Sequence, residues 1–306
     1  MSMESRPYLL HALSPLHAGT GQSVGVIDLP IARFRATHIP YVPGSSIKGV
    51  LREARRERMS EPEWQALFGP QRTVMGAEGD EMRQEDHAGA LVVSDARLLA
   101  MPVRSFHGTF ALVTSPLLLE LARRDLVGLP KLPSRIPRLK GEAMACVGTH
   151  GSVVVSPTHQ RLFLEDLDLD VSKSPLVDEW AQLLAHALPS EAELMGERLV
   201  VVDDETMSFL METATQVDTR VRIRHDTGTV AQGQLWTEES LPAESLLVGI
   251  LAAAPSFSPK APMSATQVLA RATQEVSILQ LGGKATVGRG RCQLATWESP
   301  PKETAR

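Results

Sequence analysis

Residues 17–52 have the sequence HAGTGQSVGVIDLPIARFRATHIPYVPGSSIKGVLR, which combines a glycine-rich loop with the start of a basic helix. A glycine-rich loop with Gly19, Gly21 and Gly25 leads to an isolated acid, Asp28. The GxGxxxG spacing departs from a dinucleotide-binding fingerprint, because IDLP follows where the helix of that fold must begin. Glycines favour instead a loop that a ligand backbone can approach closely. We interpret the stretch as a loop that presents one carboxylate beside a bound ligand.

The second half of this stretch predicts an amphipathic helix from about residue 45 to residue 58, with Ser45 or Ser46 as its N-cap. Free N–H groups at a helix start can bind a phosphate. A glycine inside the helix, Gly49, indicates close approach of another backbone. The basic side chains are predicted to share one side, as a phosphate-binding face or as an ordinary solvated face: Lys48, Arg52, Arg55 and Arg56.

Composition excludes several classes of protein. Among 306 residues the longest apolar candidate, LLVGILAAA (246–254), is half the length a membrane span needs, and the N-terminus lacks a signal pattern, so we expect a cytoplasmic protein without membrane contact. Two distant cysteines and nine histidines without ligand spacing indicate neither a disulfide scaffold nor a zinc site. Aromatic residues are 4% of the chain, too few for extensive base stacking.

The net charge of −5 hides strong segregation. Residues 31–60 hold seven basic residues against two acids, and residues 104–140 again hold seven against two. Residues 162–212 hold thirteen acids against two basic residues. Because binding responds to local potential, two basic regions are compatible with a nucleic-acid ligand despite the negative total.

Local patterns predict the remaining elements. Strands are expected at 7–13, 89–100, 108–115 and 246–253, and helices at 61–68, 116–125, 175–187, 204–214 and 262–277. The polar residues 70–90 predict a mobile loop, and the proline-rich, basic residues 127–142 predict an extended arm rather than packed structure. The acidic, helical segment 162–212 is interpreted as a solvated face or as a docking surface for a basic partner.

Two further segments carry basic residues on turn-rich backbone. Residues 217–240 predict a β-hairpin with Arg222 and Arg224 on a basic face, which either reaches over a nucleic-acid strand or keeps a sheet edge soluble. LGGKATVGRGR (281–291) predicts an anion-binding nest or a simple turn-rich hairpin. Its glycines and cations are Gly282, Gly283, Lys284, Gly288, Arg289, Gly290 and Arg291.

These residues resemble the RAMP superfamily, in particular the backbone subunit of the type III-B CRISPR (Cmr) RNA-guided effector complex. The likeness is carried by HAGTGQSVGVIDLPIAR, PYVPGSSIKGVLRE, LFGP, GALVVSDARLL, PVRSFHGTFALVTSP, RVRIRHDTGTVAQGQLWTEESLP and LGGKATVGRGR. It implies an α+β fold: a single domain over residues 1–306 with a modified ferredoxin-like (RRM-like) palm, inserted fingers and a β-hairpin thumb at 217–240.

The resemblance also implies a function. Such subunits bind guide RNA through its backbone, stack in several copies along it with the other subunits, and cleave complementary single-stranded target RNA at regular intervals. The residue tied to cutting falls on Asp28, the loop histidine on His17, and an acidic position on Glu238 or Glu239, where Thr237 and Ser240 flank the acids instead of the frequent aromatic residue. Guide-backbone contacts fall on the glycine loop and the helix start: Gly19, Gly21, Ser45, Ser46, Lys48, Gly49 and Arg52.

The chemistry leaves alternatives open. A carboxylate with a pKa near 3.9 is a weak base, so Asp28 is expected to hold a divalent metal, Mg²⁺ or Mn²⁺, or to position the attacking group. Asp28 can also be a turn acid or an ion-pair partner of Arg33 or Arg35. His17 either protonates the leaving group or fixes the loop. The alternative functions are a non-catalytic guide-binding subunit and a CRISPR-repeat processing endoribonuclease.

Overall fold

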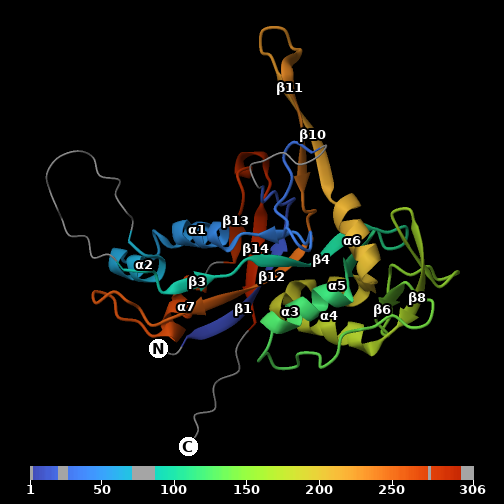
Figure 1. Cartoon of the computed structure of the whole chain (residues 1–306), viewed down its shortest axis with the longest axis horizontal. Helices are drawn as coiled ribbons and strands as arrows, with labels where there is room; N and C mark the ends of the chain where they lie inside the picture. Colours follow the sequence, from blue (N-terminus) through green and yellow to red (C-terminus); the bar gives the residue numbers. More distant parts are fainter. Residues whose placement is uncertain (1–2, 20–26, 71–86, 275–276, 298–306) are drawn as a thin grey trace, which may run out of the picture.

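A computed structural model describes residues 3–19, 27–70, 87–274 and 277–297. Most of the predicted loop at 70–90 and the position of Gly21 lie outside these residues. The described chain combines helices with one large mixed sheet and a separate two-stranded sheet (Figure 1).

The large sheet has the strand order β13-β14-β1-β12-β4-β5-β9-β6-β8-β7, with β2 added to β4 and β3 added to β12. Most neighbours are antiparallel, but β5 pairs with β9 and β6 with β8 in parallel. The strands are β1 (Glu4–Ala12), β2 (Tyr41–Val42), β3 (Leu91–Val93), β4 (Ala96–Arg104), β5 (Phe110–Thr114), β6 (Ala145–Val147), β7 (Arg161–Leu164), β8 (Leu167–Lys173), β9 (Leu199–Val202), β10 (Gln216–Ile223), β11 (Val230–Ser240), β12 (Leu246–Ala253), β13 (Ile278–Gln280) and β14 (Arg291–Thr296).

Helix starts follow local capping signals. Ser115 and Ser174 each precede a proline, and each side chain accepts a hydrogen bond from a backbone N–H of the first turn. Ser60 and Ser264 form capping boxes with the residue three positions later. The helices are α1 (Gly44–Arg55), α2 (Glu61–Phe68), α3 (Pro116–Asp125), α4 (Pro175–Ala187), η1 (Pro189–Glu191), α5 (Ala192–Arg198), α6 (Asp204–Thr213), α7 (Ala265–Thr273) and η2 (Ala285–Val287).

Alternating side chains of β1 pack into two hydrophobic cores on opposite faces of the sheet. Tyr8 and Leu10 belong to one core, which also holds the apolar faces of α1, α2, α6 and α7, while Leu9 belongs to the other, with α4 and α5. Helix α3 contributes Leu118 to the first core and Leu119 to the second. The sheet is therefore covered on both faces, which is why its central strands are almost continuously apolar.

Four strands and two helices form a compact unit within the sheet. Strand β1 lies between β14 and β12, β12 lies between β1 and β4, and all three pairings are antiparallel. Helix α1 connects β1 to β4, and α7 connects β12 to β14. Everything from residue 105 to residue 245 is inserted between β4 and β12.

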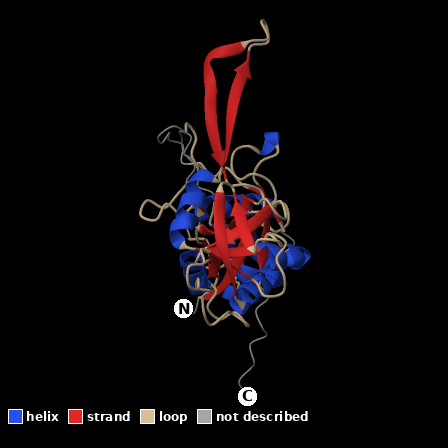
Figure 2. Cartoon of the chain, turned by 90° about the vertical axis from the view of Figure 1, so that its right-hand side faces the viewer, coloured by secondary structure: helices blue, strands red, loops and turns tan. Residues whose placement is uncertain are grey.

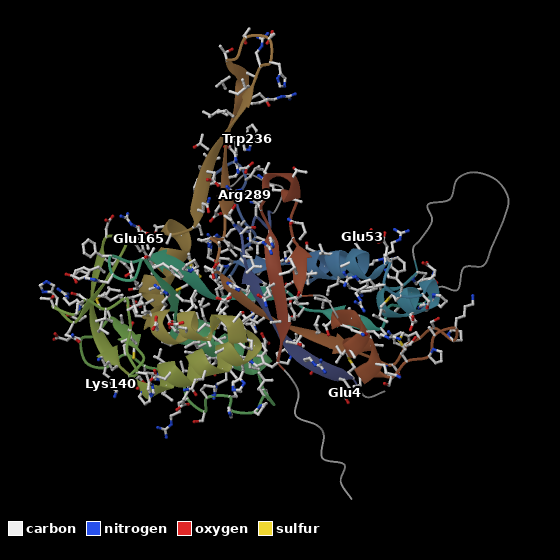
Figure 3. The ribbon with its side chains drawn as sticks, turned by 180° about the vertical axis from the view of Figure 1, so that it is seen from behind. Glu4, Glu53, Lys140, Glu165, Trp236 and Arg289 are labelled. Atoms are coloured by element: carbon white, nitrogen blue, oxygen red, sulfur yellow. The ribbon has the colours of Figure 1, made fainter. Side chains whose placement is uncertain are left out.

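The prediction of an unpacked basic arm at 127–142 was wrong. Leu129, Leu132, Ile136 and Leu139 pack against the second core, and Pro133 and Pro137 are buried with them. Apolar side chains spaced along the segment thus fasten it beneath α3 and α4. Its basic side chains stay exposed, and Lys140 lies on the side of the body opposite the hairpin (Figure 3).

The acidic segment 162–212 is more varied than a helical insertion. It contains α4, α5 and α6, but also β7, β8 and β9, and β9 is a fully buried strand of the large sheet. The acids are found mainly on exposed positions of β8 and of the helices. This segment therefore builds part of the body and carries a solvated acidic face.

Strands β10 and β11 form an antiparallel hairpin that projects from the body (Figures 1 and 2). Its register pairs Thr219 with Thr237 and Val221 with Leu235. The outer part is exposed on both faces, whereas Glu238, Glu239 and Ser240 at the end of β11 are buried. The root of the hairpin is thus part of the body.

Two glycines of α1, Gly44 and Gly49, allow a matched test of how this helix packs against the β3–β4 connection. A Cβ atom at Gly44 would clash with the backbone oxygen of Val93, whereas a Cβ atom at Gly49 would meet no described atom beyond its chain neighbours and the nearby backbone of its own helix. The predicted close approach of a backbone at Gly49 is thus absent from the described chain. We expect Gly44→Ala to destabilise the protein by about 1–3 kcal/mol through overpacking and Gly49→Ala to stabilise it by about 0.5–1 kcal/mol.

Urea unfolding of both variants measures this difference. Equal stability of the Gly44→Ala variant and the parent protein would contradict the packing of α1 against the β3–β4 connection.

Candidate active site at the hairpin root

The root of the hairpin is joined to the loop that contains Asp28. Leu29 and Glu238 form a parallel bridge, in which the Leu29 N–H donates to the Thr237 oxygen (3.1 Å) and the Glu239 N–H donates to the Leu29 oxygen (2.9 Å). The bridge brings two residues that are 209 positions apart in the sequence into contact. The loop and the hairpin therefore form one structural unit.

Asp28 presents an exposed carboxylate at this junction. Oδ2 accepts hydrogen bonds from the Thr237 backbone N–H (2.7 Å) and from the Thr237 hydroxyl (3.0 Å). The backbone N–H and then the hydroxyl of Thr237 hold the pKa of Asp28 below its ordinary value. The carboxylate is therefore ionised at neutral pH. The alternative ion pair with Arg33 does not form, because Arg33 contacts Glu239 instead.

His17 is held against the same strand. Its Nδ1 lies 2.6 Å from the Glu239 backbone oxygen, so Nδ1 carries the proton and donates it to that oxygen. The ring also fills the space above Gly19, where a Cβ atom would lie 2.5 Å from Nε2. Gly19 is thus required for the ring to lie where it does, and Nε2 is left as the position that exchanges a proton.

The two glutamates predicted to take part in cutting point into the hairpin root. Glu238 is 5% exposed and binds Lys284, Arg220 (3.3 Å) and the Trp236 indole N–H (2.7 Å). Burial raises the pKa of Glu238, but the bonds from Lys284 and Trp236 outweigh burial and hold it below the ordinary value.

Glu239 is 3% exposed and is satisfied in the same way. It accepts hydrogen bonds from the Arg33 guanidinium (2.6 Å) and from the Ile31 backbone N–H (3.0 Å). Direct contact of either glutamate with a substrate would require this pairing to break.

The second glycine-rich loop lies against the first. The Gly290 N–H donates to the Pro15 oxygen, and a Cβ atom at Gly282 would lie 2.5 Å from the His17 oxygen. Gly282, Gly288 and Gly290 adopt φ angles between +76° and +79°, which favour glycine. The close contacts and positive φ angles explain why glycine recurs in this loop.

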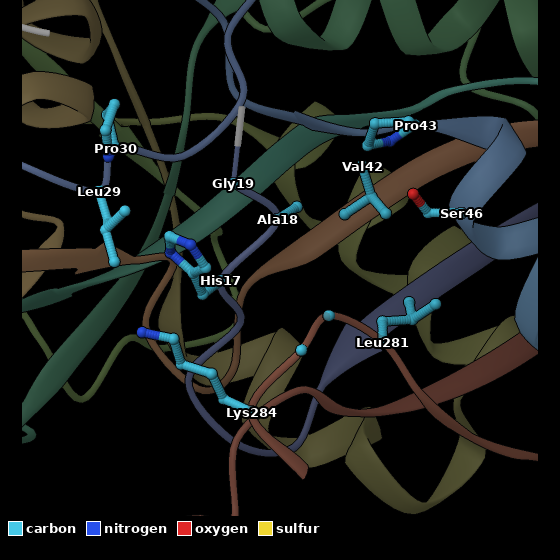
Figure 4. A pocket seen from close by; sticks show the side chains of 12 residues that line it. His17, Ala18, Gly19, Leu29, Pro30, Val42, Pro43, Ser46, Leu281 and Lys284 are labelled. Atoms are coloured by element: carbon cyan, nitrogen blue, oxygen red, sulfur yellow. The ribbon is translucent and has the colours of Figure 1, made fainter. Parts of the chain in front are cut away.

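A cavity of about 380 Å³ opens where these segments meet (Figure 4). His17, Gly19 and the Leu29–Pro30 pair line it from the first loop, and Val42, Pro43 and Ser46 line it at the start of α1. The second glycine-rich loop supplies Leu281, Gly282, Gly283 and Lys284. The structure therefore brings together five residues predicted to bind RNA: Gly19, Ser46, Gly282, Gly283 and Lys284.

Residues 9–293 match the RAMP superfamily. The chain belongs to that superfamily. It is 32% identical over 288 residues to the CRISPR system Cmr endoribonuclease Cmr4 of Pyrococcus furiosus, covering 92% of each chain. It is 25% identical over 310 residues to the CRISPR system CMR subunit Cmr4 of Saccharolobus solfataricus, covering 94% of this chain and 95% of that protein.

Solved structures share this RAMP fold. The crystal structure of oligomeric Cmr4 from Pyrococcus furiosus superposes with a TM-score of 0.72 and 26% identity, over 98% of this chain and 100% of that one. A chain in the cryo-EM structure of the type III-B Cmr-beta complex bound to cognate target RNA gives a TM-score of 0.70 and 20% identity, over 96% and 97% of the two chains.

The basic helix of this RAMP chain differs from the prediction. Helix α1 begins at Gly44 with Pro43 at the N-cap, so neither Ser45 nor Ser46 caps it. The Gly44 N–H already donates to Asp95, which occupies one of the free groups of the helix start (2.8 Å). Ser45 and Ser46 lie exposed in the first turn.

The cations of α1 are used within the protein. The Lys48 ammonium donates to the Leu91 oxygen (2.7 Å), and burial together with Arg52 lowers the pKa of Lys48. The Arg52 guanidinium lies 4.2 Å from the centre of the Trp64 ring, a cation–π contact. Arg55 is buried and donates to the Gln274 oxygen. Arg55 is therefore not part of an exposed basic face, and guide binding by Lys48 and Arg52 stays a prediction.

The remaining predicted cations divide between the hairpin and the C-terminal loop. Arg289 (labelled in Figure 3) pairs with Asp218 and donates a hydrogen bond to the Ser240 hydroxyl. Arg291 is exposed at the start of β14. Arg222 and Arg224 lie on the outer hairpin, away from the cavity, and Arg224 pairs with Asp226.

The described residues contain neither a cluster of metal-binding side chains nor a membrane-spanning helix. Among the residues that the structure describes, no group of three or more histidine, cysteine or acidic side chains could hold a metal ion. Within the same residues, no helix has both the length and the apolar character needed to cross a membrane.

The buried Glu238 gives a stability prediction. Because its folded-state pKa is depressed, its ionised form stabilises the protein at neutral pH, and this contribution is lost as the pH falls through that pKa. We expect Glu238→Gln to lower the free energy of unfolding by about 2 kcal/mol at pH 7, and the difference from the parent protein to shrink below about pH 4.

Urea unfolding between pH 7 and pH 3 measures the effect. Glu212→Gln, a change of the same kind at an exposed position of α6, is the control and should leave stability unchanged at both pH values. A pH-independent loss in Glu238→Gln would contradict the ion-pair explanation.

Proposed function

We propose that this protein is the backbone subunit of a type III-B CRISPR effector complex, and that it cleaves complementary single-stranded target RNA. The observation that carries the proposal is the exposed, ionised Asp28 at the edge of a glycine-lined cavity. The 32% identity to an endoribonuclease over 92% of both chains supports the same reaction class. The oligomeric Cmr4 structure supports assembly of several copies together with the other subunits.

The strand order supports a finer proposal for the architecture. The unit β14-β1-β12-β4, with α1 and α7 as its connections, has the order and directions of a ferredoxin-like (RRM-like) palm. The chain inserted between β4 and β12 then supplies the fingers, and the projecting β10–β11 hairpin supplies the thumb. In this arrangement Asp28 lies where the thumb leaves the palm.

Guide RNA is proposed to bind across the cavity. Backbone N–H groups at Gly282 and Gly283, the Ser46 hydroxyl and the exposed Arg291 suit phosphate oxygens. Such contacts read the sugar–phosphate backbone rather than the bases, which fits a subunit that accepts any guide sequence. Arg222 extends the same chemistry along the thumb.

The reaction proposed is a transesterification. The 2′-hydroxyl of the target loses its proton to solvent water and its oxygen attacks the adjacent phosphorus, while the bond from phosphorus to the 5′-oxygen breaks, which leaves a 2′,3′-cyclic phosphate and a 5′-hydroxyl. His17 is placed to protonate the leaving 5′-oxygen through Nε2, because Nδ1 is bound to the Glu239 oxygen. The lowered pKa of Asp28 makes it a poor proton acceptor and favours a role in holding a cation or the attacking group.

A single exposed carboxylate fits a hard divalent cation that takes its other ligands from phosphate oxygens and water, which is how Mg²⁺ is commonly bound. Asp28 would hold Mg²⁺ or Mn²⁺ in this way, and the ion would neutralise charge that develops on the reacting phosphate. Glu238 and Glu239 are proposed to support the site by fixing the strand beside it.

Asp28→Asn tests the cutting role. It keeps the side-chain shape and removes the charge, so we expect guide binding and assembly to persist while target cleavage slows by about a hundredfold or more. The measurement is a single-turnover digest of labelled target by the assembled complex, with Mg²⁺ or Mn²⁺ and with EDTA. Asp226→Asn at the hairpin tip is the control.

Three outcomes would redirect the proposal. Normal cutting by the Asp28→Asn complex excludes Asp28 as the catalytic residue. No cutting by the parent complex indicates a guide-binding subunit without catalysis. Cleavage of a CRISPR repeat without any target indicates a processing endonuclease.

Arg291→Ala tests the guide-binding surface. Loss of one phosphate contact should reduce the slope of log affinity against log salt concentration by about 0.7 for single-stranded RNA. Filter binding of guide RNA at several salt concentrations measures it. Arg138→Ala, an exposed cation of the 127–142 segment, should leave the slope unchanged. Equal slopes in all three proteins would contradict the placement of RNA on the C-terminal loop.

A further inference from the structure

Thr237 is the residue through which the hairpin touches Asp28. The Thr237 backbone N–H and hydroxyl both donate to Oδ2 of Asp28. The same hydroxyl accepts a hydrogen bond from the Asp28 backbone N–H (3.1 Å). The Thr237 oxygen also accepts from the Leu29 N–H. One side chain thus contacts both the carboxylate and the backbone of the loop.

No cation competes for this role among the described residues. Lys284 is bound to Glu238 and Arg33 is bound to Glu239, so the charges at the hairpin root are committed to other carboxylates. Thr237 donates both of its hydrogen bonds to Oδ2 of Asp28 and none to Oδ1. Thr237 therefore holds the carboxylate from one side.

Thr237 is itself rigidly placed. The next two residues, Glu238 and Glu239, are buried and carry ion pairs to two different segments. Thr237 therefore has little freedom to follow movements of the Asp28 loop. A donor with a fixed position can restrict a side chain that would otherwise rotate in solvent.

We propose that the Thr237 hydroxyl is a positioning group for target cleavage: it holds Oδ2 of Asp28 and leaves Oδ1 to act on the target RNA. The inference rests on the proposed cutting role of Asp28 and adds a residue from the thumb to the cutting machinery. It also gives the hairpin a chemical task, since a residue at its root would orient the acid proposed to cut the target.

A positioning role for Thr237 and a structural role predict different effects on the cleavage rate and on folding stability. Asp28 is fully exposed, so solvent screens its bonds to Thr237 and their loss has little effect on folding. The geometry of an acid at the reacting phosphate is far more demanding, because small displacements of a catalytic group slow a reaction strongly. A positioning group should therefore affect the cleavage rate without affecting stability.

Thr237→Val removes the hydroxyl and keeps the shape and the backbone N–H. In the complex assembled on guide RNA, we expect the single-turnover cleavage rate at saturating target to fall by about tenfold or more, the effect of losing a hydrogen bond to a charged group. Target affinity and melting temperature should stay unchanged. Thr237→Ser retains the hydroxyl and should restore most of the rate.

Thr219→Val is the matched control. Thr219 lies directly opposite Thr237 in the hairpin, so it tests the same substitution on the same ribbon. Its cleavage rate should equal that of the parent complex. A slow Thr219→Val complex would indicate that any loss of a hairpin hydroxyl is harmful, and would overturn the proposal.

The remaining outcomes are also decisive. A normal or faster rate in Thr237→Val, or a Thr237→Ser complex as slow as Thr237→Val, overturns the positioning role. Asp28→Asn in the same experiment keeps the two proposals distinct. If Asp28→Asn cuts normally, the cutting role of Asp28 fails. If Asp28→Asn is inactive while Thr237→Val is normal, only the role of Thr237 fails.

Discussion

The site depends on the bridge between Leu29 and Glu238, which joins the loop near the N-terminus to the last strand of the hairpin. Two backbone hydrogen bonds alone would leave this junction weak. Ion pairs on either side strengthen it, with Glu238 bound to Lys284 of the C-terminal loop and Glu239 bound to Arg33 of the N-terminal loop. Because both glutamates are nearly fully buried, water screens these pairs little, and three distant parts of the chain are fixed relative to one another.

The same constraint explains how a protein with a negative net charge can present a site for RNA. Many of its cationic side chains make contacts within the protein. Lys48 donates to a carbonyl oxygen, Arg52 lies over an indole ring, and Arg289 pairs with Asp218. The groups that remain around the cavity are mostly backbone N–H groups and a hydroxyl. These offer partial positive charge with fixed direction, so the fold contributes more to the proposed phosphate site than the charge count does.

Features that depend on neighbouring residues were predicted from the sequence, whereas features that depend on contacts between distant segments were not. Helix α4 begins at Pro175 after the Ser174 cap, as expected, because capping chemistry lies within one turn. The 127–142 segment was mispredicted because its prolines and basic residues outweighed Ile136 and Leu139, whose contacts come from distant helices. The resemblance assigned roles to His17 and Asp28, and the structure places His17 beside Gly282 and Gly283 of the C-terminal loop in one cavity. No local pattern could pair Thr237 with Asp28 across 209 residues.

The root of the hairpin is held by buried ion pairs, whereas its outer part is exposed to solvent. Beyond its root, Val221 and Leu235 form a pair on a ribbon with solvent on both sides, and an isolated two-stranded ribbon is only marginally stable in water. Its far end can therefore bend toward whatever it meets at small energetic cost, while its near end keeps its orientation. A ribbon that is anchored at one end only can follow the shape of a bound partner without changing the orientation of Thr237 at its root.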